Sequence, residues 1–247
     1  MMREMGPVII GGNGHSGTRV FAEIISEGGV FTGVRGLTKR KDSEDLKIIS
    51  LLNRWVRPYV SGSLSVEQDK RMRRAFSSRL RLYFPLRWRP WGFKNPRSML
   101  LLPFLSEMFP SMKFVHVVRD GRDISLGNEF VGNAYVNAYL EEDEHALSAE
   151  EKMILFWGRS NEDAMRFGET VLGPRYVRMR WEDLCTNPAV KARELLQFAG
   201  CSVDRALEIA ALVHKPSSLG RWQTFPEDTR ARVEYRGRQW LSLFGYR

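Results

Sequence analysis

The chain has 247 residues, enough for one α/β domain with a sizeable core, and its 43% hydrophobic and 27% charged residues are ordinary for a globular protein. Its two cysteines exclude a disulfide framework, and no apolar run approaches the roughly 20 residues of a membrane span. The net charge of +9 favours an anionic partner without choosing among a nucleotide, an acidic glycan, a nucleic acid and a membrane surface. The N-terminus runs straight into the first predicted strand, so we expect no signal peptide and a cytoplasmic protein.

The first elements are a short apolar strand at 7–10, a glycine-rich loop at 11–19 (GGNGHSGTR) and a helix from Val20. A strand, a tight turn and a helix start place backbone N–H groups around one point, with the positive end of the helix dipole behind them. Glycine suits this loop because the backbone must approach an anion with no Cβ in the way. The loop therefore predicts an anion site. Its candidate binding residues are Asn13, Gly14, His15, Ser16, Gly17, Thr18 and Arg19.

The loop is close to the Walker A pattern of phosphate-binding proteins but lacks its decisive lysine. Thr18 stands where that pattern has Lys, and Arg19 stands where it has Ser or Thr. The basic residue comes earlier instead, at His15. An ordinary glycine turn between a strand and a helix is the alternative interpretation of these residues.

The next part of the chain contains its most basic segment, at residues 65–91. The elements expected before it are a second short strand at 30–31, a polar loop at 38–45 and a helix at 46–56 that ends at Pro58. The basic segment has two interpretations. It is either an arginine- and tryptophan-rich surface for an anionic acceptor or nucleic acid, or a helix whose buried stripe includes Met72 and Phe76 and whose other face is solvated.

Strands and helices alternate through the rest of the chain, and the clearest strand is the continuous apolar run at 113–118. The other predicted elements are a helix at 98–105, a helix from Ser148 to Gly168, a strand at 175–180, a helix from Asn187-Pro188 to Gly200, and a helix from Asp204 to Val213, followed by a loop-like region from Lys215.

This alternation predicts one α/β domain over residues 1–247, with a P-loop-like parallel sheet flanked by helices and a mostly helical segment at 38–93 on the substrate side. Ligands of such sheets bind beyond the carboxyl ends of the strands. The loop at 11–19 and the sequence RDGRD at 119–123 both follow strands, so we expect them to share one site. The alternative for RDGRD is a cluster of surface ion pairs, Arg119 with Asp123 and Asp120 with Arg122.

Four stretches resemble the PAPS-dependent sulfotransferases (PAPS is 3′-phosphoadenosine 5′-phosphosulfate), in the bacterial and tyrosylprotein-sulfotransferase-like branch. They are the loop ending in His-Ser-Gly-Thr at 15–18, the strand with RDGRD at 114–123, the segment RMRWEDLCTNP at 178–188, and the late loop SSLGRW at 217–222. With WGFKNP at 91–96, the matches span residues 7–247. Only the first loop, RDGRD and the late loop are specific.

The resemblance implies that residues 13–19 bind the 5′-phosphosulfate of PAPS, and that Arg119, Ser218 and Arg221 bind its 3′-phosphate. Arginine suits a phosphate because its planar guanidinium can contact two oxygens at once. No metal is expected. The implied reaction is transfer of a sulfuryl group from PAPS to a hydroxyl or amine, driven by positioning and electrostatic stabilisation, with His15 as cation or proton donor.

The departures from the family pattern concern charge and the catalytic base. His15 replaces the usual Lys or Arg, and an imidazole, unlike those cations, ionises near neutral pH. Where the cytosolic enzymes carry a second serine for the 3′-phosphate, this chain has Gly127, and Asn128 is the candidate substitute. For the base, the polar loop at 38–45 offers Asp42 or Asp45, and His116 is assigned to the core.

Two other functions stay open from the sequence. One is a small-molecule kinase or NTPase with a degenerate P-loop, and the other is a nucleic-acid-binding module built on residues 70–89. The favoured partner is a small-molecule or glycan acceptor rather than a nucleic acid or a membrane, and the basic segment suggests that this acceptor is acidic. The sequence identifies neither the acceptor nor the oligomeric state.

Overall fold

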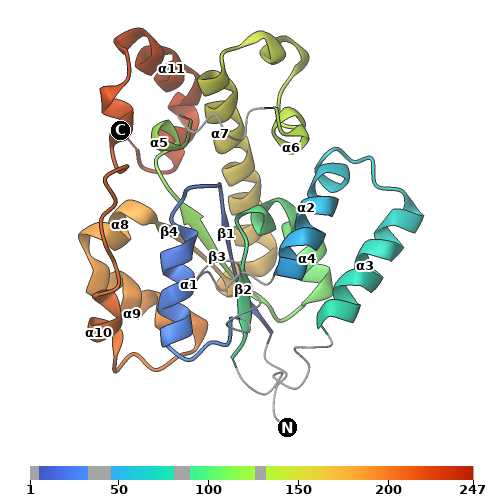
Figure 1. The fold of residues 1–247 in the computed structure, drawn as a ribbon, viewed down its shortest axis with the longest axis vertical. Helices are drawn as coiled ribbons and strands as arrows, with labels where there is room; N and C mark the ends of the chain where they lie inside the picture. The colour runs from blue at the N-terminus through green and yellow to red at the C-terminus, as the bar shows by residue number, and fades with distance from the viewer. Residues whose placement is uncertain (1–5, 33–45, 81–89, 126–131, 247) are drawn as a thin grey trace.

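The computed structural model describes residues 6–32, 46–80, 90–125 and 132–246, so Asp42, Asp45 and Asn128 lie outside the described residues. Within them, parallel strands form one sheet in the order β2-β1-β3-β4 (Figure 1). The strands are β1 (Val8–Gly12), β2 (Gly92–Lys94), β3 (Lys113–Val118) and β4 (Tyr176–Arg180). The predicted parallel sheet flanked by helices is confirmed, whereas the assignment of residues 1–247 to one domain stays a prediction.

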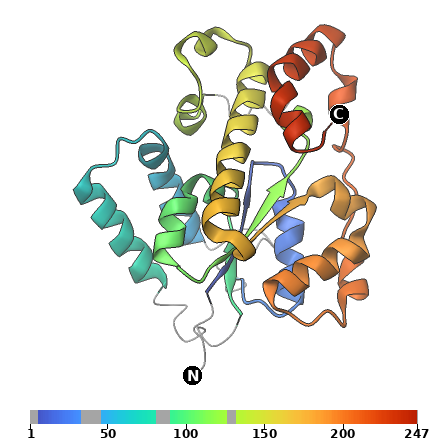
Figure 2. The same ribbon diagram turned by 180° about the vertical axis from the view of Figure 1, so that it is seen from behind.

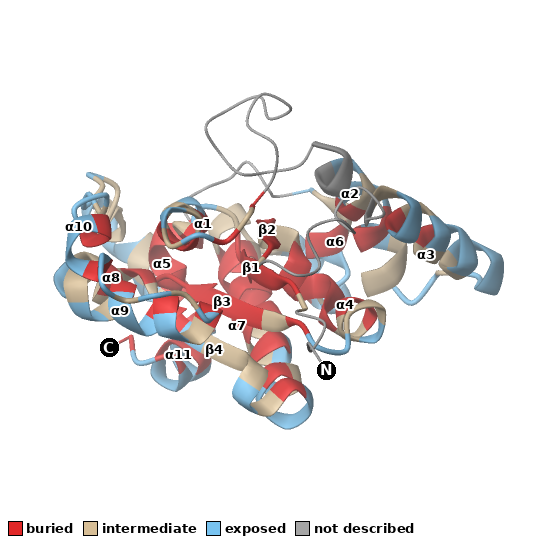
Figure 3. Cartoon of the chain, turned by 90° about the horizontal axis from the view of Figure 1, so that it is seen from below, coloured by how far each residue is buried: buried red, intermediate tan, exposed pale blue. Residues whose placement is uncertain are grey.

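The strand side chains alternate between two hydrophobic cores, one on each face of the sheet. In β3, Phe114 and Val118 belong to one core, whereas Val115 and Val117 belong to the other. Figure 3 shows the buried strands between the helical layers. Helices cover both faces, which explains why β1 and β3 are continuous apolar runs rather than alternating polar and apolar ones.

Different helices cover the two faces. The core that contains Val115 and Val117 is closed by α1 (Thr18–Glu27), α8 (Trp181–Thr186), α9 (Pro188–Ala199) and α10 (Ala206–Ala210). The opposite core is closed by α2 (Leu46–Val60), α3 (Val66–Leu80), α4 (Leu102–Met108), α7 (Ala149–Phe167) and α11 (Glu227–Leu243). Figure 2 shows α7 running across the back of the sheet.

Shorter elements join these layers. They are α5 (Gly121–Ser125), α6 (Ala134–Asn137), 3₁₀ turns at Pro96–Leu101, Glu142–Ala146, Gly173–Arg175 and Arg221–Thr224, and a π-helical turn at Gly168–Leu172 that prolongs α7.

Local sequence signals explain where the longest elements begin and end. Ser148 and Glu151 form a capping box at the start of α7, with the Ser148 hydroxyl accepting the Glu151 N–H at 3.3 Å. Gly200 ends α9 in the left-handed conformation (φ 83°), as the sequence predicts. Asn187 holds the N-cap position of α9, but its side chain makes no capping hydrogen bond.

The strand expected at 30–31 is wrong, since Phe31 makes only an isolated parallel bridge to Trp91. The pairing stops there because the next hydrogen bond would need an N–H from Pro90, which has none. The fourth strand of the sheet is β2, which follows this bridge and which the sequence analysis missed. A three-residue strand is too short for a periodicity signal.

Two predicted helix boundaries are also wrong. Pro58 lies inside the last turn of α2, which ends at Val60, because a proline there removes only the hydrogen bond to Arg54 and the helix has nearly finished. Asp204 does not cap α10, whose N-cap is Arg205. The Asp204 carboxylate instead accepts a hydrogen bond from the Ser202 hydroxyl at 2.7 Å.

The region expected to be loop-like from Lys215 contains α11, a helix of 17 residues. Its buried face consists of Val233, Gly237, Trp240 and Leu241, which follow helical spacing. One of these four positions is a glycine, and most of the remaining residues are charged. The apolar periodicity is therefore too weak to reveal the helix in the sequence.

Close packing between α7 and α11 makes Gly158 a sensitive position. A Cβ at Gly158 would lie 2.2 Å from the Trp240 ring. Helix propensity alone would make Gly158→Ala stabilising by about 1 kcal/mol. We expect the opposite sign, a loss of about 1–3 kcal/mol in the free energy of unfolding, because the two helices must separate. Urea unfolding measures this, with Arg166→Ala on the exposed face of α7 as control; a Gly158→Ala variant at least as stable as the wild type would contradict the packing.

Candidate active site

All four strands end at the same edge of the sheet, and the loop after β1 is the centre of that edge. In this loop the Ser16 N–H donates to the Asn13 carbonyl at 3.2 Å, which closes a tight turn. His15 (φ 64°) and Gly17 (φ 81°) are both left-handed, and His15 is the one non-glycine residue of positive φ among the described residues. Such a conformation in a non-glycine residue is strained and is typical of functional loops.

The loop leads directly into the N-terminus of α1. Gly17 is the N-cap residue and offers no side chain to the first N–H groups of the helix, and the first turn has no acidic residue. The positive end of the helix dipole therefore faces outward beside His15 and Ser16. This geometry can hold an anion, and the binding role of residues 13–19 stays a prediction.

Arg119, the first residue after β3, joins this loop to two other segments. Its guanidinium Nη1 donates to the His15 carbonyl at 3.1 Å, and its Nη2 pairs with the Asp123 carboxylate at 2.8 Å. The same Nη2 lies 2.5 Å from the Ser218 carbonyl oxygen and 3.4 Å from the Ser218 hydroxyl. The structure thus brings the first loop, RDGRD and the late loop together, as the sequence analysis expects.

The Asp123 carboxylate holds the late loop in place. Its two oxygens accept the backbone N–H groups of Gly220 (2.8 Å) and Trp222 (3.0 Å) in addition to the Arg119 guanidinium. Arg221 also contacts this residue: its Nη2 donates a hydrogen bond to the Asp123 carbonyl at 3.0 Å. Asp123 therefore supports the late loop as well as Arg119. The sequence analysis gave it only an ion pair with Arg119.

The ion pairs that formed the alternative interpretation of RDGRD are present, but they are buried. Besides the Arg119 pair, Arg122 pairs with Asp120 at 2.8 Å and lies 3.8 Å from the centroid of the Trp222 ring. Buried ion pairs of this kind fix geometry, because breaking one leaves an unpaired charge in the interior. Ion pairing and a role in binding are compatible for this segment.

The segment at 178–188 supports the same edge from the side of β4. Trp181 packs so closely on the loop that a Cβ at Gly17 would lie 2.7 Å from its ring. The Glu182 carboxylate accepts the Asp120 N–H at 2.9 Å and the Tyr246 hydroxyl at 2.8 Å, and burial raises the pKa of this carboxyl. These contacts give the segment a structural role in holding both the loop and RDGRD.

Two buried polar atoms at the junction lack partners, which tests whether an anion fits there. The Ser16 hydroxyl and the Arg119 Nε are both buried without a hydrogen bond. They are two of seven such atoms among the described residues, and both belong to segments that meet at the loop, where an anion would accept from them. Both are donors of the kind that phosphate oxygens accept. The residues present therefore fit a phosphorylated nucleotide.

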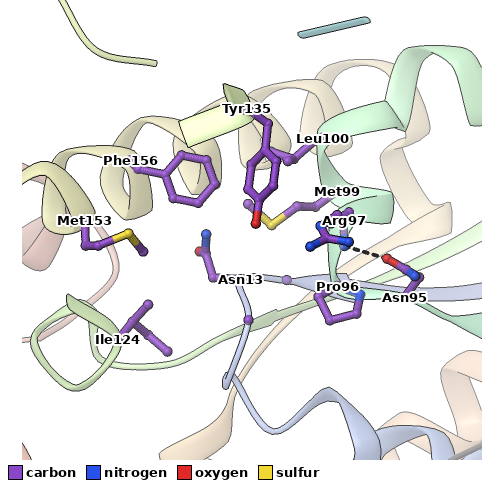
Figure 4. A pocket seen from close by; sticks show the side chains of 12 residues that line it. Asn13, Asn95, Pro96, Arg97, Met99, Leu100, Ile124, Tyr135, Met153 and Phe156 are labelled. Carbon is purple, nitrogen blue, oxygen red and sulfur yellow. Dashed lines mark hydrogen bonds between the residues drawn. The ribbon is translucent and has the colours of Figure 1, made fainter. Parts of the chain in front are cut away.

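A pocket of about 190 Å³ opens beside the loop, on the face of the sheet that α7 covers. Most of its wall is apolar: Pro96, Met99, Leu100, Ile124, Tyr135, Met153 and Phe156. Its polar lining comes from Gly12, Asn13, Gly14, Asn95 and Arg97. Figure 4 shows Asn13 rising from the floor toward the space between Phe156 and Tyr135.

Asn95 and Arg97 reach this pocket because of the way the chain leaves β2. The Asn95 side chain accepts the Arg97 N–H at 2.9 Å and caps the turn that begins at Pro96. Arg97 lies 5.1 Å from the centroid of the Tyr135 ring and donates to Asn53. Sequence reasoning missed these residues as site residues, although an Asn-Pro pair after a strand signals a capped turn at the ligand-binding edge.

A buried chain of hydrogen bonds connects β3 and β4 to the loop through α7. His116 is fully buried, and its Nδ1 lies 2.7 Å from the Tyr176 hydroxyl and its Nε2 2.8 Å from the Asn161 Oδ1. The Asn161 Nδ2 donates to the Asn13 Oδ1 at 2.5 Å. Burial lowers the pKa of His116 to about 4, so this imidazole is neutral at physiological pH.

The expected base residues cannot be placed, since Asp42 and Asp45 lie outside the described residues, as does Asn128. Among the described residues, no group of three or more His, Cys, Asp or Glu side chains is arranged to hold a metal ion. Nor does any helix in the described ranges have the length and apolar character needed to cross a membrane.

Comparison with known proteins decides the family. A sequence model of the sulfotransferase family matches residues 7–205. The chain belongs to the sulfotransferase family. This sulfotransferase has no match among curated protein sequences.

Solved structures similar to this chain include several sulfotransferases. They include the sulfotransferase STF9 from Mycobacterium avium (TM-score 0.60, 12% identity, 99% of this chain and 78% of that chain covered), the sulfotransferase domain from the curacin biosynthetic pathway (0.56, 14%, 99% and 99%) and that of the Synechococcus olefin synthase (0.51, 15%, 100% and 99%). At such identities the likeness shows the fold alone, and that fold is the one expected from the sequence.

The lowered pKa of His116 makes the stability of this sulfotransferase depend on pH. Because the folded-state pKa (about 4) lies below the unfolded value of about 6.5, the contribution is complete above pH 6.5 and is lost as the pH falls toward 4. We expect wild type to lose on the order of 3 kcal/mol more than His116→Gln across this range. Urea unfolding at several pH values measures the difference. A wild-type-minus-variant difference that does not change with pH would contradict a buried neutral His116.

Proposed function

We propose that this sulfotransferase transfers a sulfuryl group from PAPS to a hydroxyl or amine of a small acceptor. One observation carries the proposal: the Arg119 guanidinium lies 3.1 Å from the His15 carbonyl, so the glycine loop and the arginine segment are two halves of one site. PAPS carries two anionic groups on its ribose, the 3′-phosphate and the 5′-phosphosulfate, and a site with two adjacent anion-binding corners suits such a molecule. Family membership supports the same donor.

In this proposal the donor is held mainly by backbone N–H groups and arginine. The loop at 13–19 and the N-terminus of α1 bind the 5′-phosphosulfate, with His15 and Thr18 beside the bridging oxygen where charge develops. Arg119 binds the 3′-phosphate through its unpaired Nε, and Ser218 and Arg221 complete that corner. Asp123 orients Arg119 and Arg221 directly and holds the late loop through the Gly220 N–H, while Ser218 is held by Arg119.

The pocket beside Asn13 is the candidate acceptor site. Its volume of about 190 Å³ is little more than that of an apolar cavity that holds benzene, about 150 Å³, so it suits a single ring or a short alkyl group. Its wall is mostly apolar, and Arg97, the one cation among the described residues that line it, already contacts Asn53 and Tyr135. An apolar acceptor group fits this lining better than the acidic acceptor suggested by the basic segment.

The basic segment itself resembles an ordinary solvated helix where it is described. In α3, Met72 and Phe76 are buried against the core, while Arg73 pairs with Asp69 and Glu107, each at 2.7 Å. This arrangement matches the interpretation of residues 65–80 as a helix with one buried and one solvated face. It gives no support to an acidic acceptor or a nucleic-acid surface. The kinase and nucleic-acid alternatives also lack support from the family match.

The chemistry asked of the chain is mostly positioning. The acceptor oxygen or nitrogen forms a bond to sulfur, and the bond from sulfur to the bridging oxygen breaks with its electron pair left on the 5′-phosphate. The proton of the acceptor passes to a general base, for which Asp42 or Asp45 is the hypothesis. Loop N–H groups and His15 stabilise the charge on the departing oxygen, and the two corners hold the donor in line.

Binding of adenosine 3′,5′-bisphosphate tests the donor site. Arg119→Lys keeps the positive charge but loses the planar guanidinium, and we expect the affinity to fall roughly 10- to 100-fold because charge-assisted hydrogen bonds of about 1.5–3 kcal/mol are lost. Isothermal calorimetry without metal measures it. Arg166→Lys is the matched control, since Arg166 is exposed on α7 and pairs with Glu162 rather than with either loop. Equal affinities for Arg119→Lys and wild type would remove this corner from the site, and stabilisation only by ATP with magnesium would favour the kinase.

His15 tests the transfer step separately from binding. We expect His15→Ala to lower turnover of PAPS about 100-fold while changing the affinity for adenosine 3′,5′-bisphosphate only a few-fold, because charge on the bridging oxygen develops only during transfer. His15→Lys, which supplies a cation at the same place, should restore much of the rate. A normal turnover number in His15→Ala would exclude the role.

A further inference from the structure

The hydrogen bonds around Asn161 have only one possible direction, because a backbone carbonyl fixes them. The Asn161 Nδ2 lies 2.7 Å from the Trp157 carbonyl, which can only accept, so this end of the amide is the donor. The same Nδ2 therefore donates to the Asn13 Oδ1 at 2.5 Å. The opposite end, Oδ1, must then accept from His116.

The tautomer of His116 follows from this direction. Its Nε2 carries the proton donated to the Asn161 Oδ1 at 2.8 Å, so the Nδ1 of the neutral ring is an acceptor and receives the Tyr176 hydroxyl proton at 2.7 Å. Every partner in this part of the chain is therefore satisfied in one arrangement only. His116 and Asn161 are both fully buried, so no solvent molecule offers an alternative.

The orientation of Asn13 is the end result of this chain. Asn13 accepts from Asn161 through Oδ1, and its Nδ2 donates to the Ser160 hydroxyl at 3.2 Å. The Ser160 hydroxyl donates its own hydrogen bond to the Phe156 carbonyl at 2.6 Å, so it must accept from the Asn13 Nδ2. An amide nitrogen has two N–H groups, and Ser160 takes one. The second remains on a residue that lines the pocket and points into it (Figure 4).

We propose that Asn161, held by His116 and the Trp157 carbonyl, is a positioning residue that keeps the second Nδ2 N–H of Asn13 directed at the acceptor atom in the pocket. The inference rests on the proposed function. It also narrows the acceptor to an oxygen nucleophile. An alcohol or phenol oxygen has two lone pairs, one to attack sulfur and one to accept the Asn13 N–H, whereas an amine nitrogen has a single lone pair and cannot do both.

The direct test compares two probes of nearly equal size, phenol and toluene, in the complex with adenosine 3′,5′-bisphosphate. Only phenol can accept the Asn13 N–H, so the ratio of phenol to toluene affinity reports that hydrogen bond and cancels general damage to the pocket. Calorimetry should show this ratio falling on the order of tenfold in Asn161→Leu, which frees the Asn13 side chain from its fixed orientation.

Tyr176→Phe is the matched control. It removes a hydroxyl from the same buried chain but leaves His116, Asn161 and Asn13 with the partners that orient the amide. We expect an unchanged ratio in this variant, and retained affinity for adenosine 3′,5′-bisphosphate in both Tyr176→Phe and Asn161→Leu. An unchanged ratio in Asn161→Leu, or an equal fall of the ratio in Tyr176→Phe, would overturn the inference.

Two further measurements separate its failure from that of the proposed function. If wild type binds the bisphosphate but neither probe, the acceptor pocket and this inference are both wrong while the donor site stands. Nitrogen-15 spectra of wild type test the chain without any ligand. We expect a neutral His116 with the proton on Nε2 from pH 5 to 8, and a proton on Nδ1 would overturn the inference even if Asn161→Leu failed to fold.

Discussion

The site depends on the contacts of the Arg119 guanidinium. Arg119 follows β3 directly and is buried, and a buried charge is tolerated only when it is paired and hydrogen-bonded. Asp123 supplies the charge, and the carbonyls of His15 and Ser218 supply the remaining acceptors. Three segments that are about 100 residues apart in sequence, 13–19, 119–123 and 217–222, therefore meet at one carboxyl edge of the sheet. The nucleotide site that we propose depends on that meeting, because it places the glycine loop beside an arginine with an unpaired Nε.

The sheet divides the two halves of the proposed reaction. Trp181, which packs under Gly17, belongs to the core covered by α1, α8 and α9, whereas the pocket residues Met99, Met153 and Phe156 belong to the core covered by α7. The loop after β1 lies at the boundary of the two. In our proposal the donor and the acceptor therefore adjoin at residues 13–17, and the shape of this short loop matters for transfer.

Sequence could predict the parts whose signal is local. The glycine loop, the apolar run of β3 and the arginine after it are short contiguous patterns, and the known rule that parallel strands present ligands at their carboxyl ends joined them correctly. The sequence analysis missed helix α11 because a glycine, Gly237, occupies part of its buried face. It missed the hydrogen bonds from His116 through Asn161 to Asn13 for another reason. The bonded residues are 45 and 148 residues apart, and nothing in either local sequence tells which polar residues will meet.

A crystal structure with adenosine 3′,5′-bisphosphate tests the central claim most directly. The account predicts the 5′-phosphate against the backbone N–H groups of residues 14–18 and the Ser16 hydroxyl, with the 3′-phosphate within hydrogen-bonding distance of the Arg119 Nε. The cavity beside Asn13 would stay open toward the 5′-phosphate. A nucleotide bound elsewhere, or one whose 3′-phosphate lies away from Arg119, would contradict it.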